Sequence, residues 1–138
     1  MRKATGPARR AGRSADSTDT AREILDVAER LAQTRGYNGF SYADIAAALR
    51  VTKASLHYHF ASKATLGSAL IDRYSSTFVG ALDRIEARWP RPAQRLSAYV
   101  RLYDEVIRDD RMCLCGMLAA EHATLPKPMQ LRLQKFFE

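Results

Sequence analysis

Two cysteines among 138 residues are too few for a disulfide framework to organise the fold. No apolar run approaches the roughly 20 residues that span a bilayer, and no apolar segment follows the basic N-terminus as in a secretory signal. Alternating strand patterns and hairpin signals are also missing. These absences predict an all-α protein, with the cytoplasm as its default compartment and no membrane partner.

Acidic residues are scarce in the first half of the chain. The protein has a net charge of +7, and residues 1–63 contain 11 Lys and Arg against 6 Asp and Glu. A basic half indicates a polyanionic partner, most commonly nucleic acid. Ordinary solubility charge is the alternative explanation.

Residues 1–17 lack hydrophobic periodicity and are rich in Arg, Gly, Ala and Ser, which predicts a flexible basic arm. Its cations could follow DNA phosphates or enter a minor groove, although a leader without a role is equally compatible. These cations are Arg2, Lys3, Arg9, Arg10 and Arg13.

From Thr18 onward, apolar residues recur three or four positions apart, which is the helical period. Thr18 or Thr20 is expected to cap the first helix, with Glu23 completing a capping box after Thr20. The final pattern continues through Phe136 and Phe137, which indicates a truncated chain or a surface that another subunit buries. The expected helices cover residues 18–35, 41–49, 52–59, 62–89, 92–107, 112–123 and 129 onward, with Ser41, Thr52 and Ser62 as the N-caps of the second, third and fourth.

Residues 41–60 contain two short helices joined by a very short turn, which predicts a helix-turn-helix. Small Ala46 allows the helices to approach closely, and Val51 and Leu56 contribute to a miniature core. Arg50 occupies the turn position that usually adopts a left-handed conformation and therefore favours glycine. Such a unit places its second helix in the major groove of DNA.

Several polar side chains of this segment are expected to contact DNA. Lys53 can donate to guanine or phosphate, Ala54 can touch a thymine methyl, and Ser55 can read a base edge. Helix N-termini favour phosphate, and basic or aromatic flanks can hold the backbone. The expected DNA-contacting residues are Ser41, Tyr42, Arg50, Thr52, Lys53, Ala54, Ser55, His57, Tyr58, His59 and Lys63.

A specific motif runs through residues 36–66. Its elements are Gly36-Tyr37, Ser41, Ile45-Ala46, Val51-Thr52, Leu56, His59-Phe60, Ser62-Lys63 and Leu66. With this motif the chain resembles, from about residue 18 onward, the TetR family of bacterial transcriptional repressors. His57 departs from the family's usual Tyr, and Arg50 departs from its usual Gly.

The resemblance implies a three-helix DNA-binding domain at residues 18–64, joined by a long helix to a helical effector-binding and dimerisation domain at 65–138. It implies a homodimeric repressor that binds palindromic duplex DNA. A small-molecule effector would release it by changing the spacing of two recognition helices, roughly 34 Å apart. The helix that starts near Lys63 would be the lever. Two long helices that family members usually carry are absent from the sequence.

Aromatic and Met residues of the C-terminal part are candidates for an effector pocket that would suit a flat apolar ligand. Their spacing is equally that of a helix-bundle core. The candidates are Phe78, Leu82, Tyr99, Tyr103, Met112, Met117 and His122.

Other chemistries fit the sequence less well. His57 and His59 would lie about 200° apart around a helix, so they cannot chelate one metal ion. No nucleophile or orienting acid accompanies them, and we expect no cofactor and no enzymatic activity. Cys113 and Cys115 fit packing better than redox sensing. A helical sensor or protein-interaction module without specific DNA binding is the alternative function.

Overall fold

The computed structural model describes residues 11–138, and these residues form helices without any strand. The predicted all-α class is confirmed. The main helices are α1 (Ala11–Arg35), α2 (Tyr42–Leu49), α3 (Lys53–His59), α4 (Lys63–Arg88), α5 (Pro92–Arg108), α6 (Leu114–Ala120) and α7 (Lys127–Phe137). Two short 3-10 turns, η1 (Tyr37–Gly39) and η2 (His122–Thr124), complete the order.

Helix α1 begins at Ala11, seven residues before the expected start at Thr18. The prediction of a flexible arm is therefore wrong for residues 11–17, and the rest of that arm, residues 1–10, lies outside the described residues. Thr20 does not cap the helix, because its hydroxyl donates to the Asp16 carbonyl at 2.9 Å inside it. A Thr hydroxyl can bond to a carbonyl inside a helix as well as cap its first turn, so Thr20 does not mark the start of α1.

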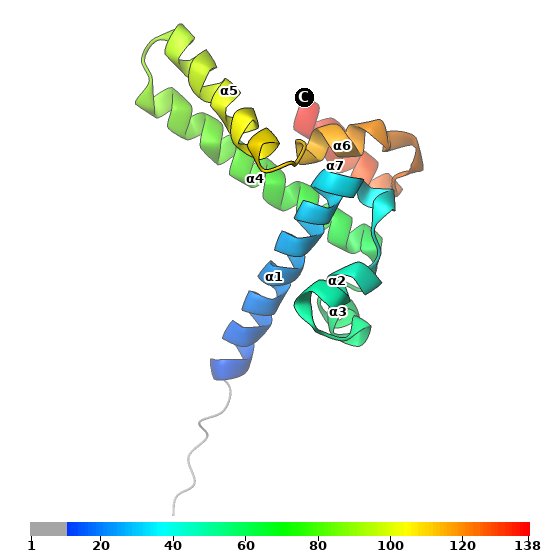
Figure 1. The fold of residues 1–138 in the computed structure, drawn as a ribbon. Helices are drawn as coiled ribbons and strands as arrows, with labels where there is room; N and C mark the ends of the chain where they lie inside the picture. The colour runs from blue at the N-terminus through cyan, green and yellow to red at the C-terminus, as the bar shows by residue number, and fades with distance from the viewer. Residues whose placement is uncertain (1–10) are drawn as a thin grey trace, which may run out of the picture.

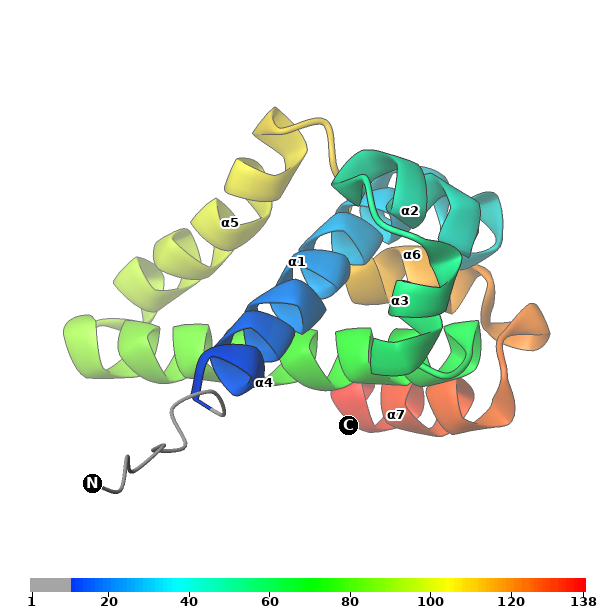
Figure 2. The ribbon, with the colours of Figure 1, turned by 90° about the horizontal axis from the view of Figure 1, so that it is seen from below.

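The helices form an N-terminal unit of three and a C-terminal unit that includes a long hairpin (Figure 1). Helices α4 and α5 make the hairpin, and Pro92 in the first turn of α5 suits a helix start. Helix α1 crosses α4, while α6 packs mainly on α1, and α7 packs along α4 beside α6. Seen from below, α2 and α3 lie together next to α1 and the start of α4 (Figure 2).

One hydrophobic core joins the two units. Ile24 of α1, Leu56 of α3 and Leu66 of α4 belong to the same buried cluster as Leu118 of α6 and Met129 of α7. Helix α5 contributes little to this cluster and leaves large apolar side chains in solvent. Those of α5 that are exposed are Leu96, Val100 and Ile107.

Ion pairs fix α1 against α4 at the side of this core. The Arg73 guanidinium donates to Asp26 at 2.6 Å and also to Glu29, both on α1. The guanidinium and the Glu29 carboxylate are each largely shielded from solvent. Because the pair is partly buried, it holds the start of the long helix in a defined direction more firmly than an exposed pair would.

Candidate nucleic-acid interface

Side-chain caps define where α2 and α3 begin. The Asp44 carboxylate accepts from the backbone N–H of Ser41 at 2.8 Å, which forms the capping box of α2. The Thr52 hydroxyl oxygen accepts from the Ser55 N–H at 3.1 Å at the start of α3. Each hydroxyl or carboxylate satisfies a backbone donor that a helix start leaves without a partner. Both predicted caps are confirmed.

The turn between these helices has the predicted left-handed residue. Arg50 has φ 56° and ψ 41°, and the Val51 N–H donates to the Ala46 carbonyl at 3.1 Å. A side chain with a β-carbon is strained in this region, where glycine is not. The Arg50 side chain is exposed at the end of α2, close in sequence to the N-terminus of α3.

Replacing Arg50 with glycine should therefore raise the free energy of unfolding by about 1 kcal/mol, since glycine adopts this conformation without a steric penalty. Urea denaturation at equilibrium measures the change. The matched control is Arg35→Gly at the end of α1, where the backbone is helical and a loss of stability is expected. A less stable Arg50→Gly variant would show that the turn is not strained.

Helix α3 is held on α2 by contacts that face inward. Ile45 and Leu56 are fully buried, and the Tyr42 hydroxyl donates to the Phe60 carbonyl at 2.8 Å. Burial raises the pKa of Tyr42 to about 12. Tyr42, expected at the DNA surface, instead fixes the end of α3, and its hydroxyl is committed inside the protein.

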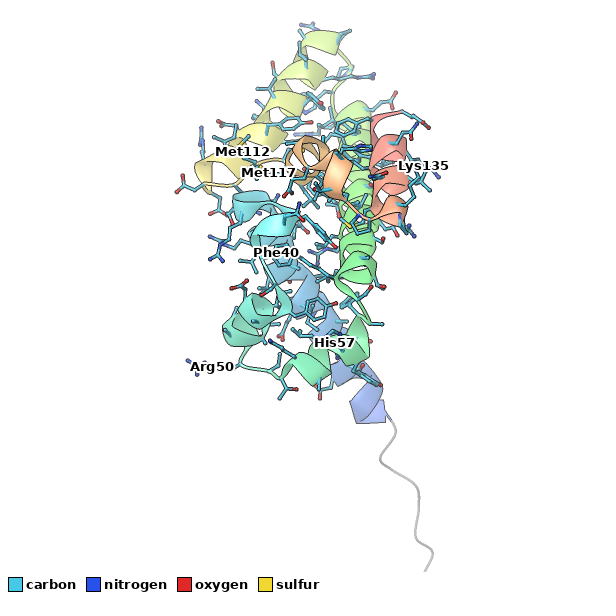
Figure 3. The ribbon with its side chains drawn as sticks, turned by 90° about the vertical axis from the view of Figure 1, so that its right-hand side faces the viewer. Phe40, Arg50, His57, Met112, Met117 and Lys135 are labelled. Carbon is cyan, nitrogen blue, oxygen red and sulfur yellow. The ribbon has the colours of Figure 1, made fainter. Side chains whose placement is uncertain are left out.

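The opposite face of α3 is open to solvent. Lys53, Ala54, His57 and Tyr58 are exposed, and Tyr58 shows 79% of its surface. Other expected contact residues border this face: Ser41, Arg50 and Thr52 are exposed, whereas Ser55 and His59 are half-buried. Arg50 and His57 lie at the same end of the molecule, far from Met112 and Met117 (Figure 3).

The two histidines have separate environments. The His57 ring packs on Tyr42 with 4.7 Å between centroids, while the His59 ring meets the edge of Tyr58 at 5.1 Å. His57 Nδ1 lies 3.1 Å from the Ala61 carbonyl oxygen. A carbonyl only accepts, so Nδ1 carries the proton and donates. The neutral ring then presents Nε2 as an acceptor, and donation to a phosphate requires the imidazolium form.

Lys63, expected to contact DNA, instead makes its contacts within the protein. Its ammonium donates to the carbonyls of Tyr37 and Phe40 and lies 4.4 and 4.3 Å from the centroids of their rings. Burial lowers the pKa of Lys63, and the charges of Glu121 and Asp44 oppose that shift. The ammonium group thus holds the segment before α2 through these two carbonyls.

The C-terminal part contains an aromatic cavity of about 130 Å³ between α4 and α5. Phe78 and Tyr103, both expected pocket residues, line it together with Tyr74. The Tyr99 ring packs against both Phe78 and Tyr103, and its hydroxyl is 3.0 Å from that of Tyr103. Three of the expected pocket residues, Phe78, Tyr99 and Tyr103, therefore lie together at this cavity.

Other expected pocket residues lie elsewhere. Leu82 lines an adjoining groove with Phe136 and Lys135 instead. The lining of the aromatic cavity does not include Met112, Met117 or His122. Met112 is 55% exposed and His122 is exposed, so neither fits a buried pocket or core position. Both follow breaks in the helices, where apolar periodicity does not predict the direction of a side chain.

Comparison with known proteins identifies the fold and the segment that contains α2 and α3. Residues 24–70, which include α2, α3 and their core, match the family model described as "Bacterial regulatory proteins, tetR family". A solved TetR-family transcriptional regulator from Agrobacterium tumefaciens superposes with a TM-score of 0.84 at 32% identity, covering 88% of this chain and 65% of that one. The chain belongs to the TetR family.

Two further relatives support the assignment. The transcriptional repressor DhaR of Mycobacterium sp. (strain GP1) is 27% identical over 88% of this TetR-family chain and 61% of its own length. The structure of AibR in complex with isovaleryl coenzyme A and operator DNA superposes with a TM-score of 0.65 at 31% identity, covering 85% of this chain and 63% of AibR. The chain thus spans about three-fifths of the length of these relatives.

The two cysteines of this TetR-family chain differ in environment. Both are free, and the Tyr74 hydroxyl donates to Cys113 Sγ at 3.3 Å. Cys115 is fully buried in the core, and burial raises the pKa of its thiol to about 12. Within the described part of the chain, no helix has the length and apolar character of a membrane span.

Proposed function

We propose that this TetR-family chain belongs to a transcriptional repressor that reads a palindromic DNA operator as a homodimer. The observation that carries the proposal is the exposed face of α3, where Lys53, Ala54 and Tyr58 project from a helix that is capped and fixed on a buried core. A rigid helix presenting small and basic groups matches the requirements for entry into a major groove. In this proposal residues 18–64 read DNA and residues 65–138 bind effector and partner.

The experiment that tests this function is selection of bound duplexes from random DNA, followed by sequencing. Enrichment of a palindrome would support both sequence-specific binding and a two-fold symmetric dimer. Tight binding without any enriched sequence would contradict the proposal and favour a helical sensor or interaction module with an incidental basic half. Competition with unrelated duplex at fixed salt controls for charge alone.

The contribution of Lys53 can be measured separately. Replacing Lys53 with alanine should weaken binding to the selected duplex and flatten the slope of log K against log salt by about 0.9, the effect of one lost phosphate contact. Lys127→Ala, at the equivalent first position of α7, is the matched control. Equal affinities and slopes for parent and Lys53→Ala would show that Lys53 is not at the DNA.

We further propose that release is caused by a small flat apolar effector in the aromatic cavity. An apolar cavity of about 150 Å³ can hold a benzene-sized molecule, and this one is of comparable size. Titration with single-ring aromatic compounds, read by tyrosine fluorescence and by loss of the duplex complex, tests the proposal. Phe78→Ala should remove the response, and ligands that act equally on that variant would exclude this cavity.

A further inference from the structure

The turn η1, which leads from α1 into α2, is bound by a residue from the C-terminal half. The Glu121 carboxylate, at the end of α6, accepts from the Tyr37 N–H at 2.6 Å and from the Asn38 N–H at 3.1 Å. Hydrogen bonds from a backbone N–H to an ionised carboxylate are among the strong ones in proteins. The segment that orients α2 is therefore tied to α6 across more than eighty residues of sequence.

The contact is built for close approach. Gly36 has φ 79°, and a β-carbon there would lie 2.8 to 2.9 Å from the Glu121 carboxylate atoms. The backbone conformation thus favours glycine, and a β-carbon there would displace the Glu121 carboxylate. A third hydrogen bond lies beside the two that Glu121 accepts, since the Asn38 side-chain amide donates to the Thr124 hydroxyl at 2.8 Å.

Both sides of η1 are held by charged groups. Glu121 takes its N–H groups from the α6 side, and the Lys63 ammonium takes the carbonyls of Tyr37 and Phe40 from the α4 side. The segment that carries Glu121 is itself held by α7, because Gln130 of α7 donates to the His122 carbonyl at 2.9 Å. A shift of either α4 or α6 would therefore displace η1.

A displacement of η1 would move the DNA-reading face as one piece. Phe40 and Ser41 alone separate η1 from α2, and the Tyr42 hydroxyl bonds α2 to the end of α3. Helices α2 and α3 share a buried core, so neither moves easily without the other. The position of α6 is thereby passed to α3 through hydrogen bonds, separately from the long helix α4.

We infer that Glu121 is a positioning residue for the helix-turn-helix: its carboxylate sets the orientation of α2 and α3 relative to α6 through the backbone of η1. The consequence for DNA rests on the proposed function. The mechanical part, an orientation set by one carboxylate, does not depend on it.

The test uses isotopically labelled full chain, with Glu121→Ala and Glu121→Gln as variants. Amide hydrogen exchange at Tyr37 and Asn38 should accelerate about tenfold or more in Glu121→Ala, because two charge-assisted bonds are lost. Glu121→Gln keeps one acceptor oxygen and should give an intermediate rate. The control is Asp72→Ala, which loses the Arg132 ion pair at 3.1 Å between α4 and α7 and leaves η1 untouched.

Residual dipolar couplings report the orientation of α2 and α3 relative to α6. We expect Glu121→Ala to change it and Asp72→Ala to leave it as in the parent. A parent-like orientation in Glu121→Ala overturns the positioning role, even if the variant is less stable. Unchanged exchange at Tyr37 and Asn38 overturns the contact itself.

The DNA arm uses the duplex from the random selection and a shuffled version of it. Glu121→Ala should lose at least fivefold in preference for the selected duplex, with affinity for the shuffled one retained, whereas a simple loss of folded protein would lower both affinities together. An unchanged preference overturns the role of Glu121 in recognition. If the parent itself shows no preference, the proposed function fails, and the orientation measurement still decides whether Glu121 positions these helices.

Discussion

A Lys63→Met variant should lose about 2–4 kcal/mol of unfolding free energy, a large fraction of the stability of a small domain. The Lys63 ammonium donates to the carbonyls of Tyr37 and Phe40 beneath two aromatic rings. Methionine keeps much of the apolar length but offers no donor, so both carbonyls lose a charged partner. Equilibrium denaturation in urea measures the loss.

The control for this variant is Lys53→Met. Lys53 is also the first residue of a helix, but its side chain is exposed. Replacing it should change stability by less than about 0.5 kcal/mol, as is usual for surface positions. The two variants should also differ at DNA: Lys63→Met keeps the parent's salt slope, whereas Lys53→Met flattens it. Equal stabilities would contradict the internal role of Lys63.

Alkaline pH should destabilise the protein through Cys115. Its pKa is about 12 in the folded state, against 9.0 for an ordinary thiol, because burial disfavours the thiolate. An acid whose pKa is raised by folding contributes full stability below its unfolded pKa. That stability is lost as the pH rises from about 9 to about 12, by up to about 1.4 kcal/mol per pH unit.

The window between pH 9 and 10 isolates this thiol from the tyrosines. Tyr42 has a pKa of about 12 in the folded state and 10.0 as its ordinary value, so its own contribution starts to fall only near pH 10. A Cys115→Ala variant, measured against its own stability at pH 8, should show a flatter decline over pH 9 to 10. A Cys113→Ala variant serves as control. Parallel curves for parent and Cys115→Ala would show that the thiol ionises normally.

Local signals predicted the elements of this fold well. Ser41, Thr52 and Ser62 are N-caps as expected, and Ser62 accepts from the Thr65 N–H at 3.1 Å. Arg50 is left-handed because the turn geometry requires it whichever residue is present. Each of these features depends on atoms within a few residues, so the sequence pattern contains the information.

Features that depend on distant atoms were not predictable in the same way. Nothing near Lys63 indicates that its carbonyl partners lie 23 and 26 residues earlier. Glu121 follows an apolar helix and has no local signal for its bonds to η1, and Tyr42 looks like a surface aromatic until the Phe60 carbonyl is placed. A short-range pattern tells which side chains are polar, but tertiary packing decides which backbone groups they satisfy.

The continuous core has a consequence for how the protein unfolds. Leu56 of α3 and Met129 of α7 belong to one buried cluster, so removing either helix exposes the apolar surface of the other. Helices α2 and α3 then gain part of their stability from the C-terminal helices, and we expect both to unfold in a single cooperative transition. Helix α5, with little share in that cluster, is free to open at lower cost than the rest. A molecule that binds beside α5 would thus displace the helix that costs least free energy to move, while the remaining helices stay together through their shared core.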